Sequence, residues 1–133
     1  MASELPNEIK ALIESHIDGF NTQNDERFVK LFDEGATIVD GIAPYRWISP
    51  GAPAQWLAEC VRWRKKFDVS HESLSYEMSL WMVEGSHAYA VVSGTLSVTM
   101  KGQTVERTGL LTYTFSKGED GWKIGAQAWG RTS

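Results

Sequence analysis

The stretch SLSYEMSLWM, residues 73–82, decides the fold class, because apolar and polar side chains alternate along it. Alternation with a period of two predicts a β-strand with one face on an apolar core. The face expected to be apolar carries Leu74, Tyr76, Met78, Leu80 and Met82. Short turns that contain glycine follow at residues 84–86, 101–103 and 117–121, and such turns join antiparallel strands. From about residue 69 the chain is therefore expected to form a meander of four long strands, with the later three at roughly 87–100, 104–115 and 122–129.

The first half of the chain has a helical pattern instead. Apolar side chains recur every three or four residues, which predicts helices at about 5–23, 25–34 and 52–67. Ser3 and Asn7 are candidate caps for the first helix. The β-branched run at residues 36–40 predicts a short strand, and the following prolines and glycines predict a loop up to Gly51. The expected architecture is a single α+β domain over residues 1–133, in which three helices pack on a curved antiparallel sheet of one short strand plus the four-stranded meander.

Neither face of this meander is cleanly polar. One face of its third strand is expected to carry Arg107, Gly109, Leu111, Tyr113 and Phe115. In the last strand, Gln127 and Trp129 are expected on the face opposite Trp122 and Ile124. A second subunit stacked on the outer face would cover the apolar side chains there, so we expect a homodimer through the sheet face.

Composition narrows the class of protein. A net charge of −4 and a pI near 5.3 argue against a nucleic-acid partner, which would need a basic face. The lone Cys60 cannot form an internal disulfide, no apolar run approaches the roughly 18 residues of a membrane span, and the N-terminus lacks a signal-peptide core. We expect a soluble, cytoplasmic protein with no membrane partner. Six tryptophans are many for 133 residues, which indicates a lined cavity or an interface.

Asp40 and His16 are the candidate catalytic residues. Asp40 ends the predicted short strand and His16 lies on the apolar stripe of the first helix, so both are expected to aim at the same interior and to form an acid/base pair. Two structural alternatives stay open. Asp40 could cap the turn at Gly41, and His16 could be a hydrogen-bonded core histidine.

Several aromatic residues are candidates for a binding pocket. Trp56, Trp63 and Trp129 are interpreted as pocket wall or core. Tyr45 and Trp47 lie on the loop beyond Asp40, where they would form a pocket mouth or a dimer contact.

Arg107 and Gln127 would be costly inside the protein unless hydrogen-bonded, and Tyr113 would share their face. The three histidines are scattered and there is one thiol, so no metal site is expected. No phosphate-binding glycine loop is present.

The order helix, helix, strand, helix and meander resembles nuclear-transport-factor-2-like domains of the SnoaL-like and ketosteroid-isomerase-like kind. The residues that carry this resemblance are Phe20-Asn21, Leu31-Phe32, Ala36-Thr37-Ile38-Val39-Asp40, Gly121-Trp122-Lys123-Ile124 and Trp129-Gly130. The resemblance spans nearly the whole chain. It implies a cone-shaped, cystatin-like α+β fold with a deep hydrophobic pocket between the helices and the concave face of the sheet.

Resemblance to the steroid isomerases carries over in part. Asp40 falls where those enzymes keep their general base, His16 where they offer an oxyanion-binding Tyr, and Trp129 resembles an aromatic of their cavity wall. At Leu111 they place a protonated Asp, whose loss weakens the oxyanion site; an inward Gln127 would replace it. Relatives similar to limonene-epoxide hydrolase use an Asp-Arg-Asp set. Asp40 and Arg107 could supply two of its members here, but no second Asp is expected to face inward.

The sequence therefore predicts a SnoaL-like pocket protein that transfers a proton, without a cofactor, on a small apolar carbonyl compound, as an isomerase, cyclase or dehydratase does. Asp40 would move the proton, and His16 with Gln127 or Tyr113 would stabilise oxygen charge. A water-poor wall would be formed by Trp129, Trp56 and Leu111. The alternative is a non-catalytic module on the same fold that binds a small ligand or dimerises.

Overall fold

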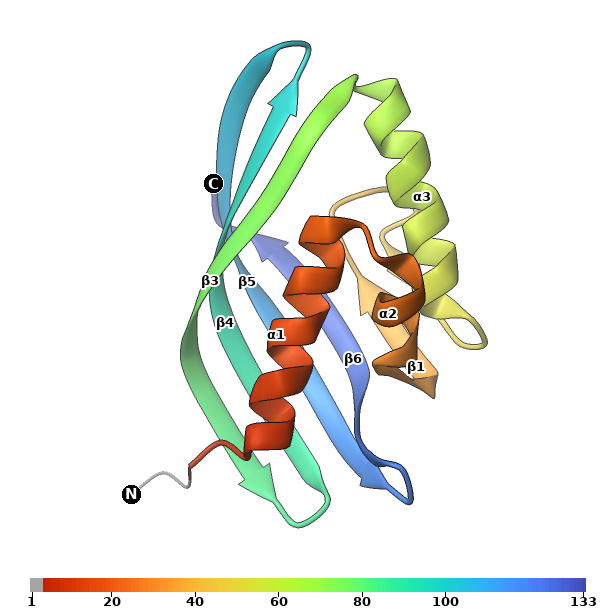
Figure 1. Cartoon of the computed structure of the whole chain (residues 1–133), viewed down its shortest axis with the longest axis vertical. Helices are drawn as coiled ribbons and strands as arrows, with labels where there is room; N and C mark the ends of the chain where they lie inside the picture. Colours follow the sequence, from red (N-terminus) through yellow and green to blue (C-terminus); the bar gives the residue numbers. More distant parts are fainter. Residues whose placement is uncertain (1–3) are drawn as a thin grey trace.

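The computed structural model describes residues 4–133 and has an α+β fold (Figure 1), as the sequence predicts. Within these residues, the helices are α1 (Asn7–Thr22), α2 (Asp25–Lys30) and α3 (Ala52–Lys66). The strands are β1 (Phe32–Val39), β2 (Arg46–Trp47), β3 (Val69–Glu84), β4 (His87–Met100), β5 (Gln103–Gly118) and β6 (Gly121–Arg131). They form one curved six-stranded sheet in the order β2-β1-β6-β5-β4-β3, in which β1 runs parallel to β6 and the other neighbours are antiparallel. The prediction of an antiparallel sheet with one short strand before the meander was wrong in two respects. β1 pairs in parallel with β6, and a second short strand, β2, forms inside the predicted loop because Trp47 pairs with Ile38.

Helix α1 buries its apolar stripe, including Ile9, Ile13 and His16, against the concave face of the sheet. Asn7 is the first helical residue and makes no capping hydrogen bond, while Ser3 lies outside the described residues. No helix within residues 4–133 combines the length and the apolar character needed to cross a membrane.

The boundary between α2 and β1 differs from the prediction. The helix ends at Lys30 rather than near residue 34, and the strand begins at Phe32 rather than at Ala36. Pairing with β6 is the reason, because the Ile124 amide donates to the Leu31 carbonyl at 2.9 Å and Phe32 lies beside Ile124 in the parallel ladder. A partner more than 90 residues away in the chain therefore overrides the local helical pattern.

A β-bulge near Gly125 changes which side chains of β6 face inward. Phe115 pairs with Ile124, whereas the preceding residue of β5 pairs with Ala126, so the alternation shifts by one residue. Ile124 is fully buried and lies on the same face as Gln127. The prediction that these two residues oppose each other was wrong, because a bulge breaks the period of two.

A second shift lies within the stretch SLSYEMSLWM. Met78 pairs with Val92, but Leu80 pairs with Val91, so Leu80 and Met82 turn to the outer face, where they are 48% and 57% exposed. The prediction that they share the inner face with Met78 was wrong. Leu80 and Met82 therefore add exposed apolar surface to the outer face of the sheet.

Candidate functional site

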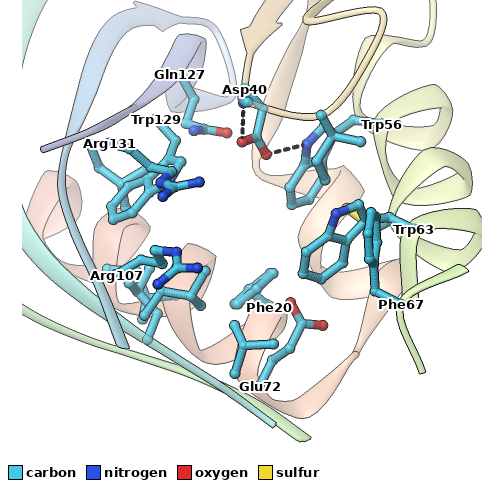
Figure 2. Close-up of a pocket in the computed structure, with 18 of the residues that line it drawn as sticks. Phe20, Asp40, Trp56, Trp63, Phe67, Glu72, Arg107, Gln127, Trp129 and Arg131 are labelled. Carbon is cyan, nitrogen blue, oxygen red and sulfur yellow. Dashed lines mark hydrogen bonds between the residues drawn. The ribbon is translucent and has the colours of Figure 1, made fainter. Parts of the chain in front are cut away.

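A cavity of about 290 Å³ lies between α1, α3 and the concave face of the sheet (Figure 2). Its lining is mostly apolar and includes Phe20, Leu74, Val98 and Met100. Its size is near the lower end of the range of roughly 300–1,000 Å³ that is typical of small-molecule sites.

Asp40 lies on the cavity wall, directly after the last residue of β1. Its Oδ2 accepts a hydrogen bond from Trp56 Nε1 at 2.8 Å, and its Oδ1 accepts one from the Gly41 amide at 2.6 Å. Burial raises the pKa of Asp40 above its ordinary value, the two hydrogen bonds oppose that rise, and the charge of Glu72 adds to it. The expected cap at Gly41 and the expected place in the pocket are therefore both realised. A carboxylate has about four lone-pair sites, so both oxygens can still accept a ligand proton.

His16, which lines the same cavity, forms a buried pair with Tyr113. Tyr113 Oη lies 2.8 Å from His16 Nδ1, and the imidazole is also packed against the rings of Phe28 and Phe32. Burial lowers the pKa of His16 from 6.5 to about 3, so the ring is neutral near pH 7. Burial also raises the pKa of the Tyr113 hydroxyl well above its ordinary value, so Tyr113 stays protonated.

Two buried polar atoms at this cavity lack a protein partner. Among residues 4–133, His16 Nε2 and Gln127 Oε1 are the buried side-chain nitrogen and oxygen atoms without a hydrogen bond. Both residues line the cavity, and Figure 2 shows the Gln127 carboxamide beside Asp40. A buried polar group without a partner costs about 1–3 kcal/mol, so a polar ligand that paired with these atoms would recover that energy.

Aromatic rings form the wall opposite the sheet. Trp56 stacks on Phe28 with ring centroids 5.4 Å apart, and Trp63 lies against Phe67 at 5.6 Å. On the sheet itself, Trp129 lies across Gly109. These rings give the site walls that exclude water and strengthen each electrostatic contact inside.

Replacing Gly109 by Ala is expected to destabilise the protein by about 1–3 kcal/mol and to narrow the cavity. The new Cβ would lie 2.7 Å from the Trp129 ring and 2.6 Å from the Gly130 carbonyl oxygen, and the backbone atom cannot move away cheaply. Urea denaturation measures the change. At Gly94 the new Cβ would meet Trp129 and Leu74 side-chain atoms at 3.1 and 3.2 Å, so Gly94→Ala is the milder control; equal stability of Gly109→Ala and wild type would contradict the prediction.

A partly buried ion pair lies at the cavity, with Glu72 in its lining. Arg64 of α3 donates to the carboxylate of Glu72 on β3, and the two side chains are 17% and 9% exposed. Sequence reasoning did not identify Glu72. It could have been found only by bringing the end of α3 next to the start of β3, because the two partners are eight positions apart in the sequence.

The structure brings most of the predicted site residues together. The cavity is lined by Asp40, His16, Trp56, Trp63, Arg107, Leu111, Gln127 and Trp129. Arg131 also lines it and was missed, because the last strand was expected to end near Trp129. Continuing the alternation two residues past Trp129 would have indicated it.

Three predicted residues lie outside the lining. Tyr113 lies behind His16 rather than in the cavity wall. Tyr45 is 60% exposed on the tight turn after β1, and Trp47 is buried in the core, where β2 pairs with Ile38. The start of this loop, Gly41 and Ile42, lines the cavity, but the part that carries Tyr45 and Trp47 turns back along β1. This corrects the expectation of a pocket mouth at Tyr45 and Trp47.

Solved structures share this fold. A nuclear-transport-factor-2-like superfamily protein from Salmonella enterica matches with a TM-score of 0.78 at 16% identity, over 95% of this chain and 89% of that chain. The hexachlorocyclohexane dehydrochlorinase LinA-type3 from Novosphingobium barchaimii matches with a TM-score of 0.76 at 10% identity, over 94% and 84%. A ketosteroid isomerase-like protein from Erwinia carotovora atroseptica matches with a TM-score of 0.76 at 12% identity, over 94% of each chain. No family model matches the sequence, and no curated protein matches it. The neighbours confirm the nuclear-transport-factor-2-like fold that the sequence predicts.

Proposed function

We propose that this chain binds a small, largely apolar carbonyl compound in the cavity and moves a proton on it, with Asp40 as the general base. The observation that carries the proposal is a carboxylate on an apolar cavity wall, oriented by Trp56 and Gly41 and with a pKa that burial raises. A base with a raised pKa accepts a carbon-bound proton more readily at neutral pH. Among proteins of the same fold, a dehydrochlorinase and a ketosteroid isomerase-like protein add support by analogy only.

The proposed step breaks a C–H bond next to the carbonyl group. The proton passes to a free lone pair of Asp40, and the electron pair moves into the carbonyl to form an enolate. Return of the proton to another carbon would complete an isomerisation. Loss of a hydroxide from the β-carbon, with a proton from Asp40 or water, would complete a dehydration instead. Neither outcome changes the oxidation state of the substrate as a whole, so the step needs no redox partner.

The enolate oxygen needs hydrogen-bond donors. If the Tyr113 hydroxyl donates to His16 Nδ1, the hydrogen of the neutral imidazole lies on Nε2, the atom that has no protein partner. A ligand oxygen could then accept that hydrogen, and the amide group of Gln127 would provide a second contact. Preorganised donors of this kind stabilise a developing oxyanion by several kcal/mol.

Solvent-deuterium exchange tests this function. The wild-type protein would be incubated in deuterated buffer near neutral pH with 2-cyclohexenone and with a cyclic β-diketone, and incorporation would be followed by mass. Catalysed exchange that depends on Asp40 is the expected result. No exchange with any carbonyl compound that binds would contradict it.

The internal hydrogen bonds also favour a second candidate function, a non-catalytic ligand-binding module. Each carboxylate oxygen of Asp40 already has a protein donor, and His16 already has Tyr113. Leu111 occupies the place where the steroid isomerases keep a second oxyanion donor. Tight binding of a carbonyl compound without exchange or turnover would decide for this module.

We also propose a homodimer through the outer face of the sheet. A continuous row of paired residues, Val39, Ala128, Thr112, Val91 and Leu80, crosses five strands on this face. All three helices of residues 4–133 lie on the other side, so this row is uncovered in the single chain. Val39, Leu80 and Leu110 are 43%, 48% and 42% exposed, and a partner would bury them.

Sedimentation velocity at micromolar concentration is expected to give twice the 14.9 kDa mass of the chain. Thr112→Lys, at the centre of the row, should give the single-chain mass, because a lysine would be desolvated between the two sheets. Thr22→Lys, on an exposed turn of α1, is the matched control. A wild-type protein that sediments at the mass of one chain would contradict the dimer.

A further inference from the structure

The cavity contains two arginines whose charge no acidic side chain balances. Arg107 of β5 and Arg131 of β6 both line it, and Figure 2 shows their guanidinium groups on its sheet side. Within the described part of the chain, neither forms an ion pair with an Asp or Glu side chain. Arg107 reaches the Glu106 carbonyl oxygen at 3.4 Å, and Arg131 Nε donates to the Ser133 backbone oxygen at 2.9 Å. Most of their N–H donors therefore remain available to a ligand.

The sheet holds the two arginines side by side. Arg131 lies opposite Gly109 in the β5–β6 ladder, and Arg107 is two residues from Gly109 on the same face. Diagonal neighbours of this kind lie about 7–8 Å apart. The end of β6 is tied to β5, because the Thr132 amide donates to the Thr108 carbonyl at 2.8 Å and the two threonine hydroxyls lie 2.9 Å apart. Two guanidinium groups held at this spacing can bind one planar anion between them.

The acidic groups of the cavity do not neutralise this pair. Glu72 forms its ion pair with Arg64. Asp40 accepts its hydrogen bonds from neutral donors, the Trp56 indole and the Gly41 amide. His16 carries no charge near pH 7, as described above. With Asp40 ionised, the side chains of the lining together with Arg64 therefore keep an excess of one positive charge, on a lining that is mostly apolar. Arg107 is half-buried and Arg131 is exposed at the end of β6.

We propose that the ligand is an apolar carboxylic acid, bound as its anion, with the carboxylate between Arg107 and Arg131. Its ring system would lie against the tryptophans of the cavity wall, and the volume of about 290 Å³ suits a compound of one or two rings. The carboxylate matches the planar fork of a guanidinium group, which can donate two parallel hydrogen bonds to it. This inference deepens the proposed function and rests on it for the reaction, since the C–H bond that Asp40 breaks would belong to the body of this acid.

Isothermal titration with 2-naphthoate and its neutral analogue 2-naphthamide tests the proposal, because the two probes differ only in charge and hydrogen bonding at one end. Wild-type protein is expected to bind the acid at least tenfold more tightly than the amide. The double variant Arg107→Gln/Arg131→Gln should lose at least tenfold in affinity for the acid and less than about twofold for the amide. Retained amide binding also shows that the double variant is folded. If the double variant does not fold, the single variants are tested instead, and each should lose at least threefold in affinity for the acid.

The matched control is Arg46→Gln/Arg62→Gln, which removes the same charge from residues that do not line the cavity, and it should keep the preference for the acid. Equal affinity of wild type for the two probes, binding of neither probe at 1 mM, or the same loss in the control would overturn the proposal.

Asp40→Asn separates this inference from the proposed function. The variant should keep or increase the preference for the acid, because it removes a negative charge from the cavity, while it loses exchange activity. Acid binding through the two arginines with no exchange by wild type would overturn the proposed reaction and leave the anion site standing. Catalysed exchange into neutral enones, without any preference of the protein for the acid over the amide, would overturn the anion site and leave the proposed reaction standing.

Discussion

Replacing Asp40 by Asn is expected to lower the rate of catalysed deuterium exchange by about 10²–10⁴-fold, the usual contribution of a general base. The amide has nearly the same shape as the carboxylate and its oxygen can still accept from Trp56, so the affinity for a carbonyl ligand should stay within about tenfold. A rate equal to that of wild type would remove Asp40 from the mechanism.

The pH dependence of the exchange rate gives a second test of Asp40 as the general base. Asp40 acts as a base only when ionised, so the rate should fall as the pH drops through its pKa, which lies above the ordinary value of 3.8 because of burial. The hydrogen bond from Trp56 lowers that pKa. Trp56→Phe should therefore move the acid limb to higher pH, while Trp47→Phe, in the core and outside the cavity lining, should leave it in place. An acid limb that does not move in Trp56→Phe would contradict the role of this hydrogen bond.

Replacing Arg64 by Met is expected to destabilise the protein by about 3–5 kcal/mol, because the variant would leave the Glu72 carboxylate mostly buried and without its partner. The side chains of the pair are 17% and 9% exposed, so water cannot easily compensate. Urea denaturation near pH 7 measures the change in the free energy of unfolding. The double variant Arg64→Met/Glu72→Gln should recover most of the loss, since it removes the uncompensated charge.

The exposed pair of α2 is the control for this experiment. Lys30 and Glu26 are 73% and 83% exposed, so Lys30→Met should change the free energy of unfolding by less than about 1 kcal/mol. A loss in Arg64→Met as small as that in Lys30→Met would show that Glu72 is solvated in the folded protein.

The helices and the long strands could be predicted because their signals are local. The apolar stripe of α1, the period of two in β4 and β5, and the glycine turns between strands all lie within a few neighbouring residues. The position of Asp40 after β1 and of His16 on the buried stripe of α1 follows from the same patterns. The structure places both residues at one cavity, as expected.

The sequence by itself determined the α+β class, the order of the three helices, β1 and the four long strands, and the inner face of β5, from Arg107 to Phe115. It did not indicate β2. Only the tertiary structure decided which residues the bulges turn inward or outward, that β1 starts at Phe32, and that Arg131 and Glu72 reach the cavity. The physical reason is that side-chain alternation is a property of one strand, whereas register, bulges and strand ends depend on hydrogen bonds to a neighbouring strand. For β1 that neighbour is β6, whose residues lie more than 80 positions away in the sequence.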